Sequence, residues 1–337
     1  MHDVSLFDKM GKKVYEREED TMKKLTVLAT AAMLAAVPVA GVSAAGDLTF
    51  ATGGSSGTYY AFGSVLAGEV SSDTDTTVTA VESNGSADNV DQVDAGDADI
   101  AFCQSDVMAY AHDGINLFEG DPIDSFSTVA ALYQEQVQII TTNPDIKTVA
   151  DLKGKNVSIG ASGSGVYFNA MDLLNAYGLT EEDINPTYES FADSADSLKD
   201  GKIDAAFITA GAPTTAVTDL STAKDVYLVS IDDEHMKTLL EECPYYTENT
   251  ISADTYGLDE DVKTVAVGAV VIASNDVSEE DIYNFVSGVF EHTDAIKTAH
   301  AKGEELNLDY AASITSVPYH AGAAKYFEEK GLTVEAE

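Results

Sequence analysis

Three residues close to position 55 have the spacing of a catalytic motif. Gly53, Ser55 and Gly57 spell G-x-S-x-G, the pattern that presents a nucleophilic serine in serine hydrolases. The same segment, 53–58, follows an apolar, strand-like run and leads into a predicted helix. Its backbone amides and hydroxyls are therefore equally suited to holding a small anion. The motif leaves two chemistries open: acyl transfer at Ser55, or anion binding by the whole loop.

Position in the chain argues against a hydrolase. The motif of an α/β-hydrolase needs earlier strands and an oxyanion loop before it, and an acid and a histidine after it. Five histidines follow residue 100, but 48–52 is predicted to be the first strand and leaves no room for the oxyanion loop. We therefore expect no enzyme and no catalytic residue, and keep a serine hydrolase that uses Ser55 as the alternative.

A second loop of the same kind supports anion binding. The segment 161–165, "ASGSG", follows the predicted strand 156–160 and precedes a helix that runs to about Tyr177. Helix N-termini carry unpaired N–H groups and a partial positive charge, and the serines add hydroxyl donors. Because the chain has no arginine after Arg17, a carboxylate would be held by amides and hydroxyls rather than by a guanidinium group.

The N-terminal region has the pattern of a secretory signal peptide. A start at Met22 is followed by two lysines, an apolar run over 25–39 and small residues before a cleavage site after Ala44. We expect 1–44 to be an upstream extension plus a cleaved leader, and the mature protein to be periplasmic or extracellular. The formal net charge of −40 argues against nucleic acids and anionic membranes as partners, since these bind lysine and arginine.

The two cysteines do not identify a metal site. Cys103 and Cys243 are not in a metal-binding spacing, and either one disulfide or two buried thiols is compatible with an exported protein. The chain has no P-loop, G-x-G-x-x-G or H-E-x-x-H motif. We expect no metal, no cofactor and a monomer.

Alternating strand-like and helix-like segments predict an α/β fold with largely parallel sheets. The segment 82–102 resembles 189–207: in both, a helix that begins at a serine ends at a glycine, and this glycine opens the motif G-x-x-D-x-A-F. We predict that Ser86 caps the first of these helices, and that Thr58 or Ser56 is available to cap the helix after the first loop. Ser278 and Asp281 form a capping box before a helix with apolar residues at helical spacing.

The repeat predicts two lobes of similar architecture, connected by β-rich passages at 130–155 and 263–274. Lobe I would comprise 46–138 and 263–337, and lobe II 139–262. Since ligands of open α/β sheets bind beyond the carboxyl ends of strands, both Gly/Ser loops should face one cleft.

Several segments in order resemble the TAXI family of TRAP-transporter solute-binding proteins. They are "TFATGGSSGTYYAFGSVLA", "ESNGSADNVDQVDAGDADIAFCQSD", "DLKGKNVSIGASGSG", "SLKDGKIDAAFITAGAP", "CPYY" and "YHAGAAKYFEEKGL". The resemblance implies a two-lobed type II periplasmic-binding-protein fold with a hinge. It also implies capture of a small carboxylate, such as glutamate, glutamine, a dicarboxylate or a 2-oxo acid, and delivery to a TRAP-type membrane permease. A ligand-sensing domain for a membrane receptor is a further alternative.

The resemblance and the two loops together define the expected ligand shell. Its residues are Gly54, Ser55, Ser56, Gly57, Thr58, Tyr59, Ser86, Gln104, Ser105, Tyr133, Ser162, Gly163, Ser164, Gly165, Gly211 and Ala212.

Overall fold

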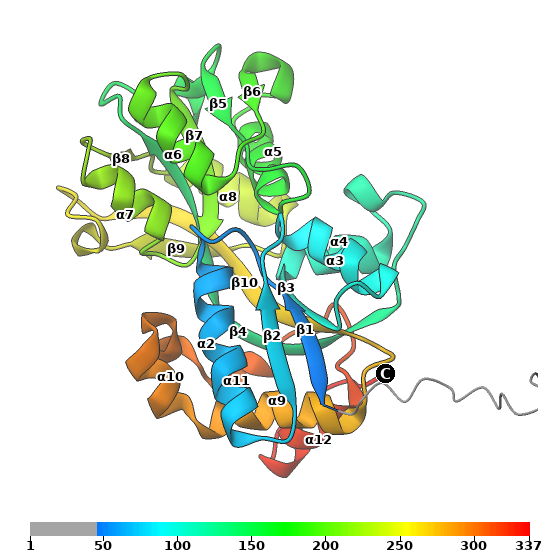
Figure 1. Cartoon of the computed structure of the whole chain (residues 1–337). Coiled ribbons are helices and arrows are strands. Elements are labelled where there is room, and N and C mark those ends of the chain that lie inside the picture. The colour runs from blue at the N-terminus through cyan, green and yellow to red at the C-terminus, as the bar shows by residue number, and fades with distance from the viewer. Residues whose placement is uncertain (1–45) are drawn as a thin grey trace, which may run out of the picture. The chain divides into compact units, whose positions relative to one another are not determined.

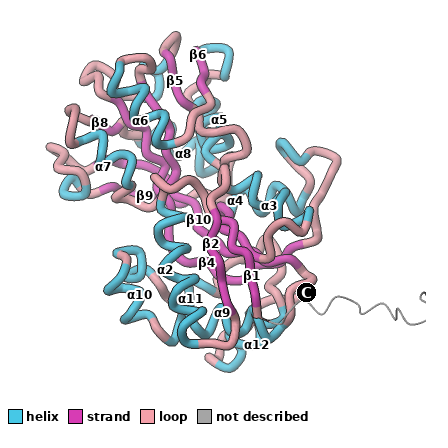
Figure 2. Tube along the Cα trace, in the orientation of Figure 1, coloured by secondary structure: helices cyan, strands magenta, loops and turns pink. Residues whose placement is uncertain are grey.

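The computed structural model describes residues 46–337, so the predicted leader lies outside the described residues. The described strands form one sheet in the order β2-β1-β3-β10-β4-β7-β5-β6, with β8 beside β4 and β9 beside β10. Helices pack around this sheet (Figure 1; Figure 2).

The strands are β1 (Asp47–Ala51), β2 (Thr77–Val81), β3 (Ile100–Gln104), β4 (Phe126–Thr141), β5 (Asn156–Ser158), β6 (Asn185–Thr187), β7 (Ala205–Ala210), β8 (Tyr227–Leu228), β9 (Thr247–Ile251) and β10 (Val262–Ser274). The α-helices are α2 (Thr58–Asp73), α3 (Ser86–Ala95), α4 (Ser105–Asp113), α5 (Val166–Ala176), α6 (Phe191–Asp200), α7 (Thr215–Ser221), α8 (Asp233–Glu242), α9 (Glu279–Glu291), α10 (Thr293–Ala299), α11 (Leu308–Ala311) and α12 (Ala321–Glu329). Short 3₁₀ turns are η1 (Asn116–Phe118), η2 (Val149–Leu152), η3 (Glu181–Asp183), η4 (Ala253–Thr255) and η5 (Ala301–Glu305).

The predicted repeat is present as two similar β-α-β-α-β units. In the first, β1 pairs in parallel with both β2 and β3; in the second, β5 pairs in parallel with both β6 and β7. The two similar sequence segments form α3–β3 and α6–β7. Each of these helices ends at a glycine in the left-handed conformation, Gly96 with φ 75° and Gly201 with φ 70°, a conformation that glycine adopts without a steric penalty.

Two long strands connect the units. β4 and β10 have 16 and 13 residues and pair with each other antiparallel. Tyr133 and Ala269 belong to the apolar core of the first unit, whereas Val137 and Val267 belong to the core of the second. Each strand therefore passes from one core to the other within a few residues.

The chain accordingly has the two-lobed type II periplasmic-binding-protein fold. We refer to β1–β3 with α2–α4 and α9–α12 as lobe I, and to β5–β7 with α5–α8 as lobe II. The expectation of largely parallel sheets holds only inside each lobe, because β10 and β4 join the lobes through antiparallel pairs. The lobe boundaries at 138/139 and 262/263 stay a prediction.

Helices α9–α12 complete lobe I beside α2 (Figure 1). The predicted cap of α9 is confirmed, since the Ser278 hydroxyl accepts a hydrogen bond from the Asp281 amide at 3.1 Å. Phe285, Val286 and Val289 of this helix are buried in the core of lobe I, as their helical spacing predicts. Among residues 46–337, no helix is long and apolar enough to cross a membrane.

Three predicted caps are wrong. Gly57, and neither Thr58 nor Ser56, is the N-cap residue of α2, and no side chain caps this helix. Ser86 is the first residue of α3 and follows the N-cap Gly85. Tertiary contacts engage two of these hydroxyls instead: Thr58 donates to a lobe II carbonyl, and Ser86 accepts a backbone amide at the end of β3.

Candidate functional site

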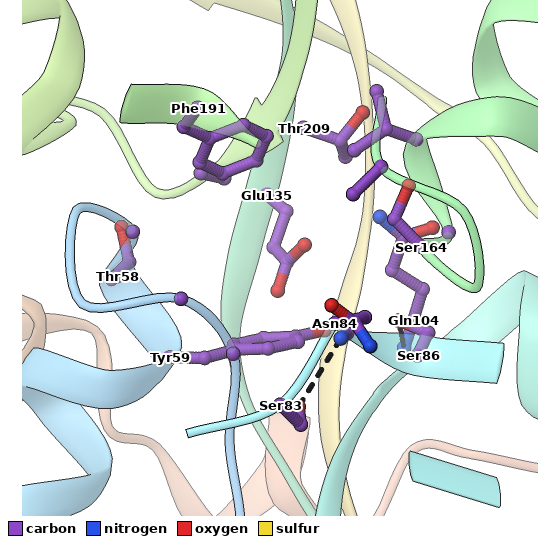
Figure 3. A pocket seen from close by; sticks show the side chains of 18 of the residues that line it. Thr58, Tyr59, Ser83, Asn84, Ser86, Gln104, Glu135, Ser164, Phe191 and Thr209 are labelled. Atoms are coloured by element: carbon purple, nitrogen blue, oxygen red, sulfur yellow. Dashed lines mark hydrogen bonds between the residues drawn. The ribbon is translucent and has the colours of Figure 1, made fainter. Parts of the chain in front are cut away.

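A cavity of about 100 Å³ lies where the two Gly/Ser loops meet (Figure 3). At roughly 10–15 Å³ for each water-sized group, it has room for about seven to ten non-hydrogen atoms. Lobe I and β4 contribute Gly53, Gly54, Ser56, Gly57, Thr58, Tyr59, Ser83, Asn84, Gly85, Ser86, Gln104, Tyr133 and Glu135. Lobe II contributes Ala161, Ser164, Gly165, Val166, Ser190, Phe191, Thr209 and Ala210.

Three helix N-termini converge on this cavity. The N-cap residues of α2, α3 and α5 are Gly57, Gly85 and Gly165, all of which line it, and none of the three helices has a side-chain cap. The first N–H groups of a helix have no partner within the helix, and its N-terminus carries about half a positive charge. Donors from both lobes therefore face one space, an arrangement that suits an anion.

The lobes are hydrogen-bonded to each other at the rim of the cavity. The Thr58 hydroxyl donates to the Gly211 carbonyl at 3.0 Å. The Asp88 amide donates to the Gly163 carbonyl at 2.9 Å. These bonds connect the start of α2 and of α3 with loops of lobe II, so the two lobes are in contact on both sides of the cavity.

Gly165 and Gln104 meet across the lobes. Gln104 is 2% exposed, and its backbone N–H donates to the Ser86 hydroxyl at 3.1 Å. A Cβ atom built on Gly165 would lie 2.2 Å from Gln104 Oε1 and 2.5 Å from Cδ, far inside van der Waals contact. A side chain at 165 would therefore require Gln104 to move or the lobes to separate.

Aromatic rings form the apolar side of the cavity. Tyr59 stacks on Phe102 with ring centroids 4.5 Å apart and an angle of 4° between the planes. Tyr133 packs edge-on against Phe102 at 6.3 Å. Figure 3 shows Tyr59 on one side of the cavity and Phe191 on the opposite side, with Glu135 between them.

Five buried side-chain oxygens that line the cavity have no hydrogen-bond partner among the described residues. They are Tyr59 Oη, Gln104 Oε1, Tyr133 Oη, Glu135 Oε1 and Ser164 Oγ. Buried polar atoms are nearly always hydrogen-bonded, and an unmade bond costs about 1–3 kcal/mol. Their concentration around one cavity marks it as the place where a polar solute would satisfy them.

Among the described residues, Glu135 is the only acidic side chain that lines this cavity. Burial raises the pKa of the Glu135 carboxyl to about 8, although the nearby Tyr59 hydroxyl, the Gln104 side chain and the charge of Lys302 oppose the shift. Asp106 of α4, which does not line the cavity, has its pKa raised to about 7 by burial and by the neighbouring Asp172. At neutral pH most Glu135 carboxyls therefore hold a proton in the solute-free protein.

Of the residues expected in the ligand shell, ten line the cavity. They are Gly54, Ser56, Gly57, Thr58, Tyr59, Ser86, Gln104, Tyr133, Ser164 and Gly165. Both loops contribute, as expected from their equivalent places in the two lobes. Whether these residues bind a solute stays a prediction.

The other six expected residues do not line the cavity. Ser55 and Ser162 are exposed, although their neighbours in the two loops line the cavity. Ser105 begins α4, and its hydroxyl accepts the Gly268 amide of β10 at 2.9 Å.

The remaining three of these residues serve contacts between and within the lobes. The Gly163 carbonyl accepts the Asp88 amide, and the Gly211 carbonyl accepts two hydroxyls, from Thr58 and Thr214. The Ala212 amide donates to Gln136 of β4 at 3.1 Å. After β7 the chain turns away from the cavity, so the end of the strand itself, Thr209 and Ala210, lines it instead.

The cavity is also lined by residues that the predicted ligand shell did not include, among them Glu135, Phe191 and the turn 83–85. Glu135 is the only acidic residue in the long apolar stretch that forms β4, and this isolation was the available signal. The turn 83–85 follows the end of β2, where ligand contacts are expected in a parallel unit. Phe191 gave no signal, since its contact with the cavity depends on how lobe II meets lobe I.

The geometry does not support Ser55 as a nucleophile. No histidine lines the cavity, and among residues 46–337 no histidine ring is hydrogen-bonded to a serine. The cysteines are both free thiols: Cys103 is buried, and Cys243 is half-buried at the end of α8.

A group of possible metal ligands lies away from the cavity. Glu69, Asp73 and His292 place one ligand atom each within 4.8 Å of one another. Asp73 is the last residue of α2, about 20 Å along the helix from the cavity at its start.

The chain is similar to known proteins in sequence and in structure. A family model described as the NMT1-like family matches residues 50–331. A solved structure from Bordetella bronchiseptica RB50 has 17% sequence identity, covers 84% of this chain and 88% of that chain, and has a TM-score of 0.50. The periplasmic aliphatic sulphonate binding protein SsuA from Escherichia coli has 18% identity, coverages of 85% and 90%, and a TM-score of 0.46. The GluR0 ligand-binding core from Nostoc punctiforme in complex with L-glutamate has 12% identity, coverages of 77% and 99%, and a TM-score of 0.47.

Proposed function

The chain belongs to the NMT1-like family, and we propose that it is an extracytoplasmic solute-binding protein that captures a small carboxylate between its lobes. The observation that carries the proposal is the convergence of three helix N-termini without side-chain caps on one cavity that both lobes line. A cavity with room for about seven to ten non-hydrogen atoms fits an amino acid, a 2-oxo acid or a small dicarboxylate.

Capture proceeds by closure of the lobes. The solute carboxylate lies on the amides and hydroxyls of the segments 54–58 and 164–166, and each charge-assisted hydrogen bond contributes about 1.5–3 kcal/mol. Thr58 and Asp88 then bond to lobe II, as seen at the rim. Because the closed form alone offers both loops to the solute, binding shifts the population toward it.

The protein releases the solute chemically unchanged. The described lining contains no histidine, cysteine or lysine, so it lacks the usual nucleophile–base pair of a hydrolase. The resemblance to the TAXI family supports a TRAP-type permease as the partner that receives the solute, and the sequence of residues 22–44 supports export. Glutamate, glutamine, dicarboxylates and 2-oxo acids are the first solutes to test.

A thermal-shift screen of the purified protein tests the proposal. The panel is L-glutamate, L-glutamine, 2-oxoglutarate and succinate, each followed by recovery and mass analysis of the solute. A ligand at a hundred times its Kd stabilises the folded state by about 2.7 kcal/mol, which raises Tm by about 4 °C.

Neighbouring serines offer a matched control. Ser56→Ala removes a hydroxyl from the cavity lining and should reduce the shift, whereas Ser55→Ala changes an exposed side chain and should not. No shift with any solute, a chemically altered solute, or loss of binding in Ser55→Ala alone would each contradict the proposal.

A further inference from the structure

Glu135 occupies an unusual position for an acidic residue. It lies in the middle of β4, opposite Val267 of β10, where the two long strands pass between the lobes. Its side chain is 1% exposed and lines the cavity. Figure 3 shows its carboxyl group pointing into the space between Phe191 and Tyr59.

Within the described part of the chain, no cationic side chain is paired with this carboxyl. Among residues 46–337 Glu135 forms no ion pair, and its Oε1 has no hydrogen-bond partner. Lys302 is close enough to act on it electrostatically, but the lysine ammonium bonds to Glu305 at 2.5 Å and lies 5.4 Å from the centroid of the Tyr133 ring. A buried carboxylate without a partner is strongly unfavourable, so a cationic partner from the solute would be correspondingly favoured.

Glu135 Oε1 and Gln104 Oε1 together give the cavity two buried acceptors that suit a donor from the solute. Gln104 Oε1 is a second buried acceptor without a partner among the described residues, in the same lining. A solute carboxylate would be repelled by the ionised carboxyl, whereas the helix N-termini attract it. The cavity is thus divided into an anion-binding part at the loops and a cation-binding part at β4.

We propose that Glu135, together with Gln104 Oε1, forms a subsite for an ammonium group, so that the preferred solute is a small zwitterion and not a purely anionic acid. This inference rests on the proposed function. It names the ammonium group as the feature by which the protein distinguishes an amino acid from the corresponding anionic acid. An amino acid places its ammonium and carboxylate groups on one carbon, within the dimensions of this cavity.

Proton release provides a signature of the subsite. Because burial raises the pKa of Glu135 to about 8, the free protein near pH 7 keeps its proton, and a bound ammonium group would favour the ionised form and expel it. Affinity for an ammonium solute should therefore rise between pH 6 and pH 8. The charged and titratable groups that face Glu135 are Tyr133 on its own strand, Tyr59, Cys103, Asp106, Tyr310, Lys302 and, through Tyr133 and Tyr310, Glu305.

Isothermal titration of the purified protein with matched solute pairs tests the inference. The pairs are L-glutamate with 2-oxoglutarate, L-valine with 2-oxoisovalerate, and L-alanine with pyruvate, which differ in the ammonium group. The wild type should bind the amino acid of the best pair at least about tenfold more tightly. Titrations in buffers of different ionisation enthalpy should show release of up to about one proton at pH 7.

Glu135→Gln keeps the shape of the side chain and removes its charge. It should abolish the preference for the amino acid and the proton release, while the 2-oxo acid binds as well as before or better. Glu248→Gln, an exposed position on β9, is the matched control and should change neither. The wild-type titrations remain decisive if Glu135→Gln does not fold.

The outcomes separate the subsite from the proposed function. Equal or tighter binding of the 2-oxo acids by the wild type, or an unchanged preference in Glu135→Gln, would refute the ammonium subsite while leaving capture of a carboxylate intact. Binding of no member of any pair would count against both.

Discussion

Replacing Gly165 by alanine should weaken solute binding without destabilising the solute-free protein. The added Cβ would lie 2.2 Å from Gln104 Oε1, 2.5 Å from Cδ and 2.9 Å from Nε2, whereas ordinary contacts begin near 3.4 Å. Gln104 is 2% exposed and lines the cavity, so its side chain can turn into that space only while no solute fills it. With a solute bound, the lobes would have to separate by roughly 1 Å.

The magnitude follows from the cost of overpacking. An extra methyl group in a well-packed site costs about 1–3 kcal/mol, which corresponds to an increase in Kd of about 5- to 150-fold. This free-energy cost applies only to the closed form, in which the lobes are in contact. Gly165 has φ −70° and ψ −19°, an ordinary helical conformation that alanine adopts freely, so the separated lobes bear no backbone strain.

The assay is isothermal titration with the tightest-binding solute, together with thermal melts without solute. Gly68→Ala is the control: Gly68 is exposed in the middle of α2, and beyond the adjacent helix backbone no atom lies within 4 Å of the place its methyl group would take. It should leave Kd unchanged and raise stability by about 0.5–1 kcal/mol. If Gly165→Ala bound the solute with the wild-type Kd, the assignment of the Gly165–Gln104 contact to the solute-bound form would be refuted.

Three further predictions concern neighbouring groups. Burial raises the pKa of Glu135 from an ordinary value of 4.5 to about 8, so its folded pKa lies above its unfolded pKa. The contribution of Glu135 to the free energy of unfolding is therefore complete below about pH 4.5 and is lost as pH rises toward 8. Between pH 5.5 and 7.5, urea melts should show that the free energy of unfolding falls by about 2–3 kcal/mol less in Glu135→Gln than in the wild type. Ser164→Ala, at a buried hydroxyl in the cavity, should raise Kd about two- to tenfold in titrations, while Ser162→Ala, exposed two residues earlier, should not. Thr58→Val removes the hydrogen bond to the Gly211 carbonyl and should weaken solute affinity by about 0.5–1.5 kcal/mol; unchanged binding would show that this bond does not contribute to closure.

Local patterns predicted much of the fold. The two similar segments form α3–β3 and α6–β7, and Ser278 caps α9 as its spacing with Asp281 indicates. These features depend on residues within a few positions of one another, so they can be predicted from backbone preferences and from the periodicity of apolar residues. The capping of α2 and α3 was not predictable in the same way, because Thr58 and Ser86 bond to residues far away in the sequence.

The site was predictable to the level of its loops but not of its individual side chains. Ser164 lines the cavity and Ser162 does not, although both belong to one run of small residues. Which of them turns inward depends on the backbone path between β5 and α5. Glu135 shows the complementary case: a single acid in a buried strand is visible in the sequence, but its role depends on what packs around it.

The sequence alone determined the α/β class, the duplication of one unit and the presence of two anion-compatible loops, because each is encoded by neighbouring residues. The tertiary structure decided that both loops, three helix N-termini and one buried carboxyl share a single cavity. This arrangement results from the packing of one lobe against the other through β4 and β10. Contacts there between residues more than a hundred positions apart determine which polar groups are hydrogen-bonded within the protein and which remain free to bind a solute.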